Sequence, residues 1–435
     1  MVRVRRGCGV VAALACSLLL AAPAFAAASS WSLSGAPIEP GPYATPEGVP
    51  SFVFAGPSRP RLLLGVGAFR FRPPGPLEQA PGSTTPVQTA VADRAGRAVY
   101  ALQDVRGAAA FGYGSSDGYA GRVQRIPSSN GRRSRITQLV GNGAGSAAAL
   151  VEWGDNALPG RPTTLAVYTR TPGRAFRRRF TLPPNAVAGI SIAPAGNVLA
   201  AWRQDDGVLA RAVGRDGMPR RSVRLATLST SSWVPAVTPA VGRGGRAEVA
   251  WVVKTESGIE ARWSLFAAAA TRELRFGRPR RLDRGPAPID VGPLHIRLRG
   301  AIADMVLVMA GSVRVNTVSG TRLLRAPQTV TGLSSTAIAV AFGPRGAILI
   351  AAGGLGAREG DVGIFARLRP SGDDPFGGQE PAISYYPDRI LGLKGLAAAF
   401  DPAGRTALIA ADMYSLACGT SCSVERLYLA TRPVG

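Results

Sequence analysis

Arginine is the residue type most able to do chemistry in this chain. The 435 residues include 51 basic side chains, of which only Lys254 and Lys394 are lysines, against 27 acidic ones, so the formal net charge is +24. A guanidinium group carries a planar fork of donors that matches the two oxygens of a carboxylate or phosphate. A chain with this charge should attract anionic polymers, and the attraction should weaken as salt rises.

Charged residues of opposite sign fall into different connections of the four-stranded repeat described below. Arginines fall into the turns between third and fourth strands, and acidic residues fall into the loops between second and third strands, which lie on the opposite face of a propeller. We call the first set the arginine rim: Arg132, Arg133, Arg177, Arg178, Arg179, Arg220, Arg221, Arg280 and Arg281. We call the second set the acidic mouth: Asp155, Asp205, Asp206, Glu256, Asp361 and Asp412. Both sets also have a plain interpretation as solvated turn residues, since charge runs are weak signals and Asp beside Gly, as in "QDDG", is good turn chemistry.

The acidic mouth allows two chemical uses. Its carboxylates could bind a cation or a cationic ligand, or two of them could act on a glycosidic bond. Other catalytic chemistry lacks the necessary residues. His295 is the only histidine, and no Gly-x-Ser-x-Gly segment marks a nucleophile.

The metal and cofactor prediction is none. No Asp-x-Asp-x-Asp-Gly calcium loop occurs, and one histidine with two late cysteines cannot build the usual zinc site. Cys418 and Cys422, in "CGTSC", are instead expected to form a local disulfide in an oxidising compartment.

A repeat of about 50 residues must position these side chains. Trp153, Trp202 and Trp251 are separated by 49 residues each and end similar runs, such as "NVLAAW" and "RAEVAW". A turn glycine precedes each run, and seven such glycines recur along the chain: Gly96, Gly145, Gly196, Gly245, Gly300, Gly346 and Gly404. The spacing lies within the range of known propeller repeats.

Each repeat reads as four antiparallel strands. Apolar runs before and after the glycine predict a hairpin whose turn needs a positive φ. A third run, such as "VLARAVGR", follows, and a more polar fourth strand, such as "RRSRITQLV" or "RRSVRLATL", completes the unit. Seven units predict an all-β, seven-bladed β-propeller, with six blades or eight as alternatives.

The ends of the chain predict how the ring closes. The last repeat stops after its third strand, and residues 61–71 form a strand without a nearby partner. We expect those residues to become the missing outer strand of the last blade, leaving no free edge. The predicted domains are therefore a signal peptide (1–26), a Pro/Gly-rich arm (27–60) and the propeller (61–435). Residues 45–86 could alternatively build a blade of their own, which would give eight.

The first 26 residues predict export. A basic start, an apolar stretch and "AFA" before Ala27 form a secretory signal with cleavage near Ala26. No later stretch approaches the length of a membrane span. The mature protein is expected outside the cell or in its envelope, where nucleic acid is a poor partner.

The repeat resembles those of uncharacterised secreted propeller proteins of high-GC bacteria, in which a glycine turn leads to a strand ending in Ala-Trp. It is similar to WD-repeat and sialidase propellers in architecture only, because the chain lacks their Trp-Asp endings and their Ser-x-Asp-x-Gly-x-x-Trp box. We expect a binding or scaffold module whose arginine rim docks on an anionic envelope or extracellular polymer, or on another envelope protein. The alternative is a carbohydrate-active enzyme, a glycoside hydrolase or lyase, that uses the acidic mouth.

Overall fold

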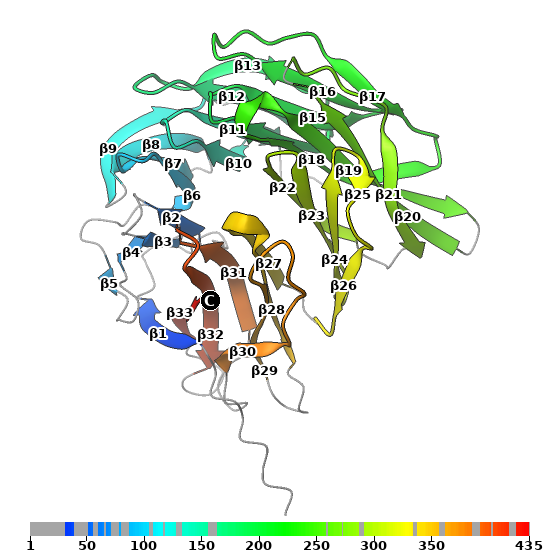
Figure 1. The fold of residues 1–435 in the computed structure, drawn as a ribbon. Coiled ribbons are helices and arrows are strands. Elements are labelled where there is room, and N and C mark those ends of the chain that lie inside the picture. The colour runs from blue at the N-terminus through cyan, green and yellow to red at the C-terminus, as the bar shows by residue number, and fades with distance from the viewer. Residues whose placement is uncertain are drawn as a thin grey trace, which may run out of the picture.

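A computed structural model describes the chain from Trp31 to Val434, except residues 39–50, 55–59, 65–66, 71–77, 80–86, 104–107, 116–117, 128–132, 155–162, 258–259, 272, 287–290, 334–336, 356–361, 385–391, 402 and 417–422. The described part folds into antiparallel four-stranded sheets, one of which has an additional short strand. Figure 1 shows these sheets arranged around a common centre, as in a β-propeller.

The seven predicted blades are all present. The first three consist of β6(Val87–Ala92), β7(Arg97–Gln103), β8(Ala109–Ser115) and β9(Gly118–Arg125); β10(Arg133–Gly141), β11(Ala147–Gly154), β12(Thr164–Arg170) and β13(Arg177–Thr181); and β14(Ala188–Ile192), β15(Val198–Gln204), β16(Gly207–Val213) and β17(Val223–Thr227). The next consists of β18(Ser232–Val241), the short 3-10 turn η1(Arg243–Gly245), β19(Ala247–Ser257), β20(Glu260–Ala270) and β21(Arg280–Pro286).

The remaining three blades complete the repeat. They consist of β22(Val291–Arg299), β23(Ile302–Met309), β24(Ser312–Ser319), β25(Arg322–Leu323) and β26(Gln328–Thr331); β27(Ala337–Phe342), the 3-10 turn η2(Pro344–Gly346), β28(Ile348–Leu355), β29(Val362–Arg369) and β30(Glu380–Ser384); and β31(Gly392–Phe400), β32(Thr406–Leu416) and β33(Ser423–Pro433) with the N-terminal strand β1(Ser32–Ile38).

An eighth sheet precedes the repeats. It contains β2(Ser51–Phe54), β3(Pro60–Leu64), β4(Gly67–Arg70) and β5(Glu78–Gln79). Strand β2 contacts both β6 and β31, so this sheet lies between the first and last repeat blades. The alternative in which residues 45–86 build a blade of their own therefore describes this region.

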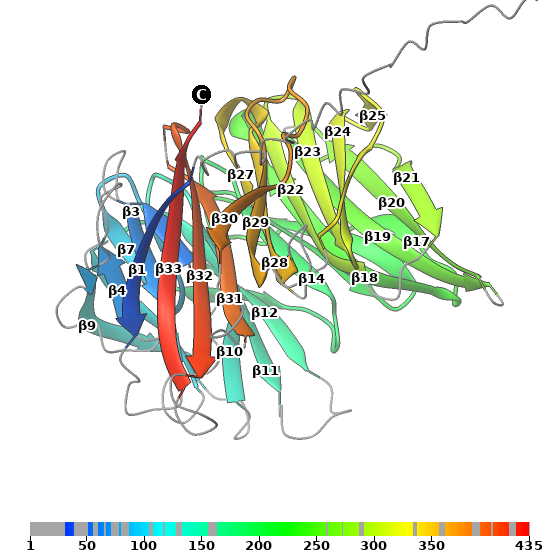
Figure 2. The ribbon, with the colours of Figure 1, turned by 90° about the horizontal axis from the view of Figure 1, so that it is seen from below.

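The ring closes with an N-terminal strand, but not with the predicted one. Strand β1 pairs with β33, from Ser32 opposite Thr431 to Ile38 opposite Glu425, and Figure 2 shows the two strands running side by side. Residues 61–71 were the wrong choice, because β3 and β4 pair with each other. Strands β1 and β2 also show that part of residues 27–60 belongs to sheets instead of an arm.

All seven turn glycines have positive φ, between 64° and 93°. In the turn before β15, the Gly196 N–H donates to the Ala193 carbonyl over 2.9 Å, and the same bond closes the turns at Gly96, Gly145, Gly245 and Gly404. An L residue with a Cβ is strained in this conformation. The glycine spacing therefore predicted the first hairpin of every repeat correctly.

Both faces of the central strands are buried between neighbouring blades. In β15, Val198, Ala200 and Trp202 pack toward the preceding blade, whereas Leu199 and Ala201 pack toward the next one. The three repeat tryptophans, Trp153, Trp202 and Trp251, are at most 5% exposed, as expected for core residues.

One predicted strand has a different place. The segment "RRSRITQLV" was assigned as the outer strand of the first repeat, but β10 is the first strand of the following blade. Its polar residues alternate because Ile136 and Leu139 are buried on one face, whereas most side chains of the other face are partly or fully exposed. The segment "RRSVRLATL" does supply an outer strand, β17.

Candidate functional site

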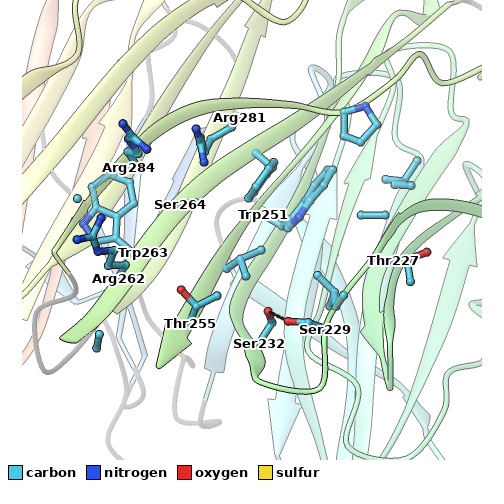
Figure 3. A pocket seen from close by; sticks show the side chains of 18 of the residues that line it. Thr227, Ser229, Ser232, Trp251, Thr255, Arg262, Trp263, Ser264, Arg281 and Arg284 are labelled. Atoms are coloured by element: carbon cyan, nitrogen blue, oxygen red, sulfur yellow. Dashed lines mark hydrogen bonds between the residues drawn. The ribbon is translucent and has the colours of Figure 1, made fainter. Parts of the chain in front are cut away.

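A groove lies between β17 and the sheet β18–β21. Its volume is about 1280 Å³, and we call it the arginine groove (Figure 3). One wall is β17 with the connection to β18, and the other wall is the face of β19, β20 and β21 that looks toward β17. The two long strands β19 and β20, of 11 residues each, give the second wall its length.

Strand register explains which side chains share the second wall. Because β19, β20 and β21 are antiparallel neighbours, residues opposite each other point to the same side of the sheet. Three cross-strand rows result: Trp251, Phe266 and Arg281; Val253, Ser264 and Arg284; Thr255, Arg262 and Pro286. The first two rows end in an arginine on the outer strand β21, so two of the three arginines lie at the outer edge of the blade.

The groove is basic without compensating acids. Arg262, Arg281 and Arg284 line it, and no described residue of the lining is acidic. All three arginine residues are exposed. Among the described residues, Arg281 and Arg284 form no ion pair, because the nearby Asp283 is engaged by Arg314, whose Nε lies 2.7 Å from Asp283 Oδ2. The groove therefore has a positive potential and guanidinium donors available for an anion.

Buried aromatic rings hold the floor of the groove. Trp251 is 1% exposed and stacks on Phe266, with ring centroids 5.9 Å apart and planes 12° apart. Trp263 is 4% exposed. These rings stabilise the wall and expose little surface to a ligand, which agrees with the structural role expected of Trp251 from the repeat.

Hydroxyl groups line both walls. Thr227 ends β17, Ser229 lies in the connection to β18, and Ser232 begins β18; the Oγ atoms of the two serines are 2.7 Å apart. Thr255 and Ser264 face them from the second wall. A hydroxyl both donates and accepts, so the groove can bind a ligand that carries hydroxyl groups as well as negative charge.

The residues of the predicted arginine rim lie in different strands and turns, and one of them lines the arginine groove. Arg281 lies in the arginine groove, directly after Arg280 at the start of β21. Arg177, Arg178 and Arg179 lie at the start of β13, and Arg220 and Arg221 follow β16. Arg133 starts the inner strand β10, so its assignment to a turn between third and fourth strands was wrong, and Arg132 lies outside the described residues.

Other members of the rim have local partners. Arg179 Nε donates to Thr169 Oγ1 over 2.6 Å, and its burial beside Arg177 lowers its pKa from the ordinary arginine value. Arg220 Nη2 lies 3.2 Å from Asp216 Oδ2 in an exposed pair. These contacts favour a structural use of the turns between third and fourth strands over an open anion site there.

The described members of the acidic mouth lie in three different blades. Asp205 and Asp206 make the exposed turn between β15 and β16, where Asp206 pairs with Arg224 at 2.9 Å, and Glu256 lies near the end of β19. Asp412 was wrongly assigned to a loop, because it lies within β32 and is 5% exposed. Asp155 and Asp361 lie outside the described residues.

Two groove residues were missed in the sequence. Arg262 and Arg284 belong to the runs "IEARWSLF" and "RRLDRGP", which become β20 and β21. The signal that could have identified them is alternation: Arg262, Ser264 and Phe266 share one face of β20, and pairing brings Arg284 onto the same face. Arg262 and Arg284 come together only through the pairing of β20 with β21. The register of this pair shifts by one residue between Leu265 and Phe266.

The remaining candidate residues are a buried histidine and two cysteines that lie outside the described residues. His295 lies in β22, where burial lowers its pKa. Cys418 and Cys422 lie outside the described residues, as does the expected signal peptide. Within the described ranges, no group of three or more His, Cys, Asp or Glu side chains could hold a metal ion. The same part of the chain contains no helix that is long and apolar enough to cross a bilayer.

Comparison with known proteins agrees with the architecture. No family model matches the sequence, and no curated protein does. The WD40 domain of SCAP from fission yeast is similar in structure, with a TM-score of 0.51 and 8% identity over 93% of this chain and 98% of that domain. The Dos1 propeller matches with a TM-score of 0.47 and 8% identity over 92% of this chain and 96% of its own.

The arrangement of the sheets and the likeness to the SCAP domain define the class of protein. The chain is a β-propeller, and it resembles the WD40 propellers at the level of fold. At 8% identity, the likeness carries no information about ligands.

Proposed function

We propose that this chain is an exported binding module that docks on an anionic polysaccharide of the cell envelope or extracellular matrix through the arginine groove. The observation that carries the proposal is the composition of the groove: three arginines and five hydroxyl side chains line it, and none of the described lining residues is acidic. The N-terminal secretory pattern supports export, and it places the module where such polymers occur.

Several features favour a polysaccharide with carboxylate groups as the ligand. Arg281 and Arg284 lie on β21, the outer strand of the blade, so a polymer can bind along this edge without threading through the ring. Guanidinium groups can bind carboxylates in a bidentate manner. Hydroxyls on both walls, such as Ser232 and Ser264, can bind sugar hydroxyls that a simple polyanion lacks.

The test compares two variants with the same change in charge. The groove variant is Arg262→Ser, Arg281→Ser and Arg284→Ser, and the matched control is Arg177→Ser, Arg178→Ser and Arg221→Ser. Binding to alginate, a polyuronate, is measured at low salt, together with thermal unfolding to show that both variants are folded. The exposed position of all six residues leads us to expect folded proteins.

We expect the groove variant to bind alginate on the order of a hundredfold more weakly, if each arginine contributes about 1 kcal/mol. The control should keep most of the affinity. Equal losses in the two variants would show attraction by net charge alone and would overturn the proposal. Binding of long-chain polyphosphate without binding of alginate would overturn the choice of a polysaccharide.

A further inference from the structure

Glu248 is a carboxyl group in a position that the fold otherwise fills with aliphatic residues. It lies three residues after the turn glycine, in β19, on the face that looks toward β22 and β23. Four other blades have a first hairpin with a turn of the same length, and at this position they place Val99, Ala148, Leu199 and Leu349, all at most 3% exposed.

The Glu248 side chain has no hydrogen-bonding partner among the residues that the structure describes. It is 1% exposed, and its Oε1 is fully buried without a hydrogen bond. Burial raises the pKa of this carboxyl to about 8, and no neighbouring charge offsets that effect. A buried polar group without a partner destabilises a fold by about 1–3 kcal/mol, so a leucine here would be more favourable for stability.

A cavity of about 600 Å³ lies beside this carboxyl. Glu248 belongs to its lining, and Phe276 and Leu298 provide apolar walls from the adjacent turn and from β22. The volume is in the ordinary range for small-molecule sites. The cavity faces β22, whereas the arginine groove faces β17, so the two lie on opposite sides of the β18–β21 blade.

The other charged groups of the cavity lie nearer to solvent. They are Arg246, directly before β19, and Glu273 and Arg275, in the connection after β20, and all three residues are exposed. Leu298 of β22 and the alanines Ala269 and Ala270 of β20 are apolar residues of the lining. The described lining therefore combines one deep carboxyl with two guanidinium groups and the Glu273 carboxylate nearer to solvent.

We propose that this cavity binds a small amino acid-like zwitterion, whose ammonium group pairs with Glu248 and whose carboxylate pairs with Arg246 and Arg275. An ammonium group supplies hydrogen-bond donors to a carboxyl that has none among the described residues, and it offsets the cost of ionising this buried group. The apolar walls fit a short aliphatic segment between the two charged ends.

Proton release gives this site a distinctive signature. Because the empty site holds Glu248 protonated at pH 7 and the bound ammonium favours the ionised form, binding should release about 0.9 proton per ligand for a pKa of about 8. Calorimetry in phosphate and in Tris buffers measures this number, because the two buffers differ in their heats of ionisation.

The experiment titrates the full mature chain with 4-aminobutyrate, n-butylamine and butyrate. We expect 4-aminobutyrate to bind most tightly with release of about one proton, n-butylamine to bind more weakly with the same release, and butyrate not to bind. Glu248→Gln should weaken the binding of 4-aminobutyrate at least tenfold and abolish proton release. Arg275→Ala should leave the number of released protons unchanged.

Glu248→Leu provides the control for folding, since leucine occupies the same position as Leu199 and Leu349. It should be folded and should bind neither amine. Absence of binding by both amines to the parent chain would overturn the proposal. Binding that survives Glu248→Gln with no change in affinity or protons would overturn it as well. Neither result bears on alginate binding at the arginine groove.

Discussion

Arg369 and Asp304 form a fully buried ion pair between neighbouring blades. Arg369 Nη2, at the end of β29, lies 2.8 Å from Asp304 Oδ1 in β23, and the two side chains are 0% and 1% exposed. Arg299 and Thr317 donate to the same carboxylate over 2.9 Å each, and Arg369 also donates to the Gly346 carbonyl. One carboxylate thus connects the β22–β26 blade to the β27–β30 blade.

Asp304→Asn is expected to lower the free energy of unfolding by about 3–5 kcal/mol, because it leaves the Arg369 guanidinium buried without a counter-charge. Denaturant unfolding measures this loss. Asp206→Asn is the matched control, since it removes an exposed pair with Arg224 and should cost at most about 1 kcal/mol. Similar losses in the two variants would show that the buried pair does not join the blades.

The turn glycines provide a test of the repeat. Gly196→Ala is expected to destabilise the protein by about 1–2 kcal/mol, because Gly196 has a φ of 93° and alanine is strained there. Gly277→Ala is the control, because Gly277 does not have positive φ and an added Cβ would lie 3.7 Å from the nearest atom. Thermal unfolding of both variants gives the comparison, and an equally stable Gly196→Ala would contradict the assigned turn.

Glu248 makes stability depend on pH in a defined direction. Its pKa is about 8 in the folded state and near 4.5 when unfolded, so unfolding releases a proton between these values. The free energy of unfolding therefore falls as pH rises from 4.5 to 8, by at most about 1.4 kcal/mol per pH unit. Above pH 8 this contribution no longer changes.

The measurement compares the parent chain with Glu248→Leu between pH 5 and 9 in the absence of amines. We expect the variant to be more stable, and its advantage to grow up to about pH 8 and then to level off. An advantage that is constant over this range would show that the carboxyl is ionised in the folded protein.

Local patterns in the sequence predicted much of the fold. Each turn glycine, such as Gly196 or Gly346, determines a hairpin over a few residues, and alternating burial follows from the pairing. The partner of β33 was not predictable in this way, because β1 lies almost 400 residues earlier in the chain and both ends offered several short apolar segments. The composition of residues 61–71 is suitable for the outer strand of the last blade, but the topology places β1 there instead.

The candidate site was less predictable for a related reason. Arg281 was identified from its turn, but Arg262 and Arg284 join it only through the register of two strand pairs, which includes a bulge. Asp412 was misplaced because β32 continues beyond its apolar run, so a carboxylate that resembles a loop residue lies inside a strand. Glu248 could have been noticed as the charged exception at a repeat position otherwise held by Val99 and Leu199.

Hydrogen exchange of the folded protein with and without alginate oligomers tests the central claim most directly, because it locates the bound polymer on the sequence. We predict slower amide exchange in residues 227–232, 262–266 and 281–286, the segments that line the arginine groove. Protection confined to residues 177–179 and 220–221, or absent from both regions while alginate is bound, would contradict binding in the groove.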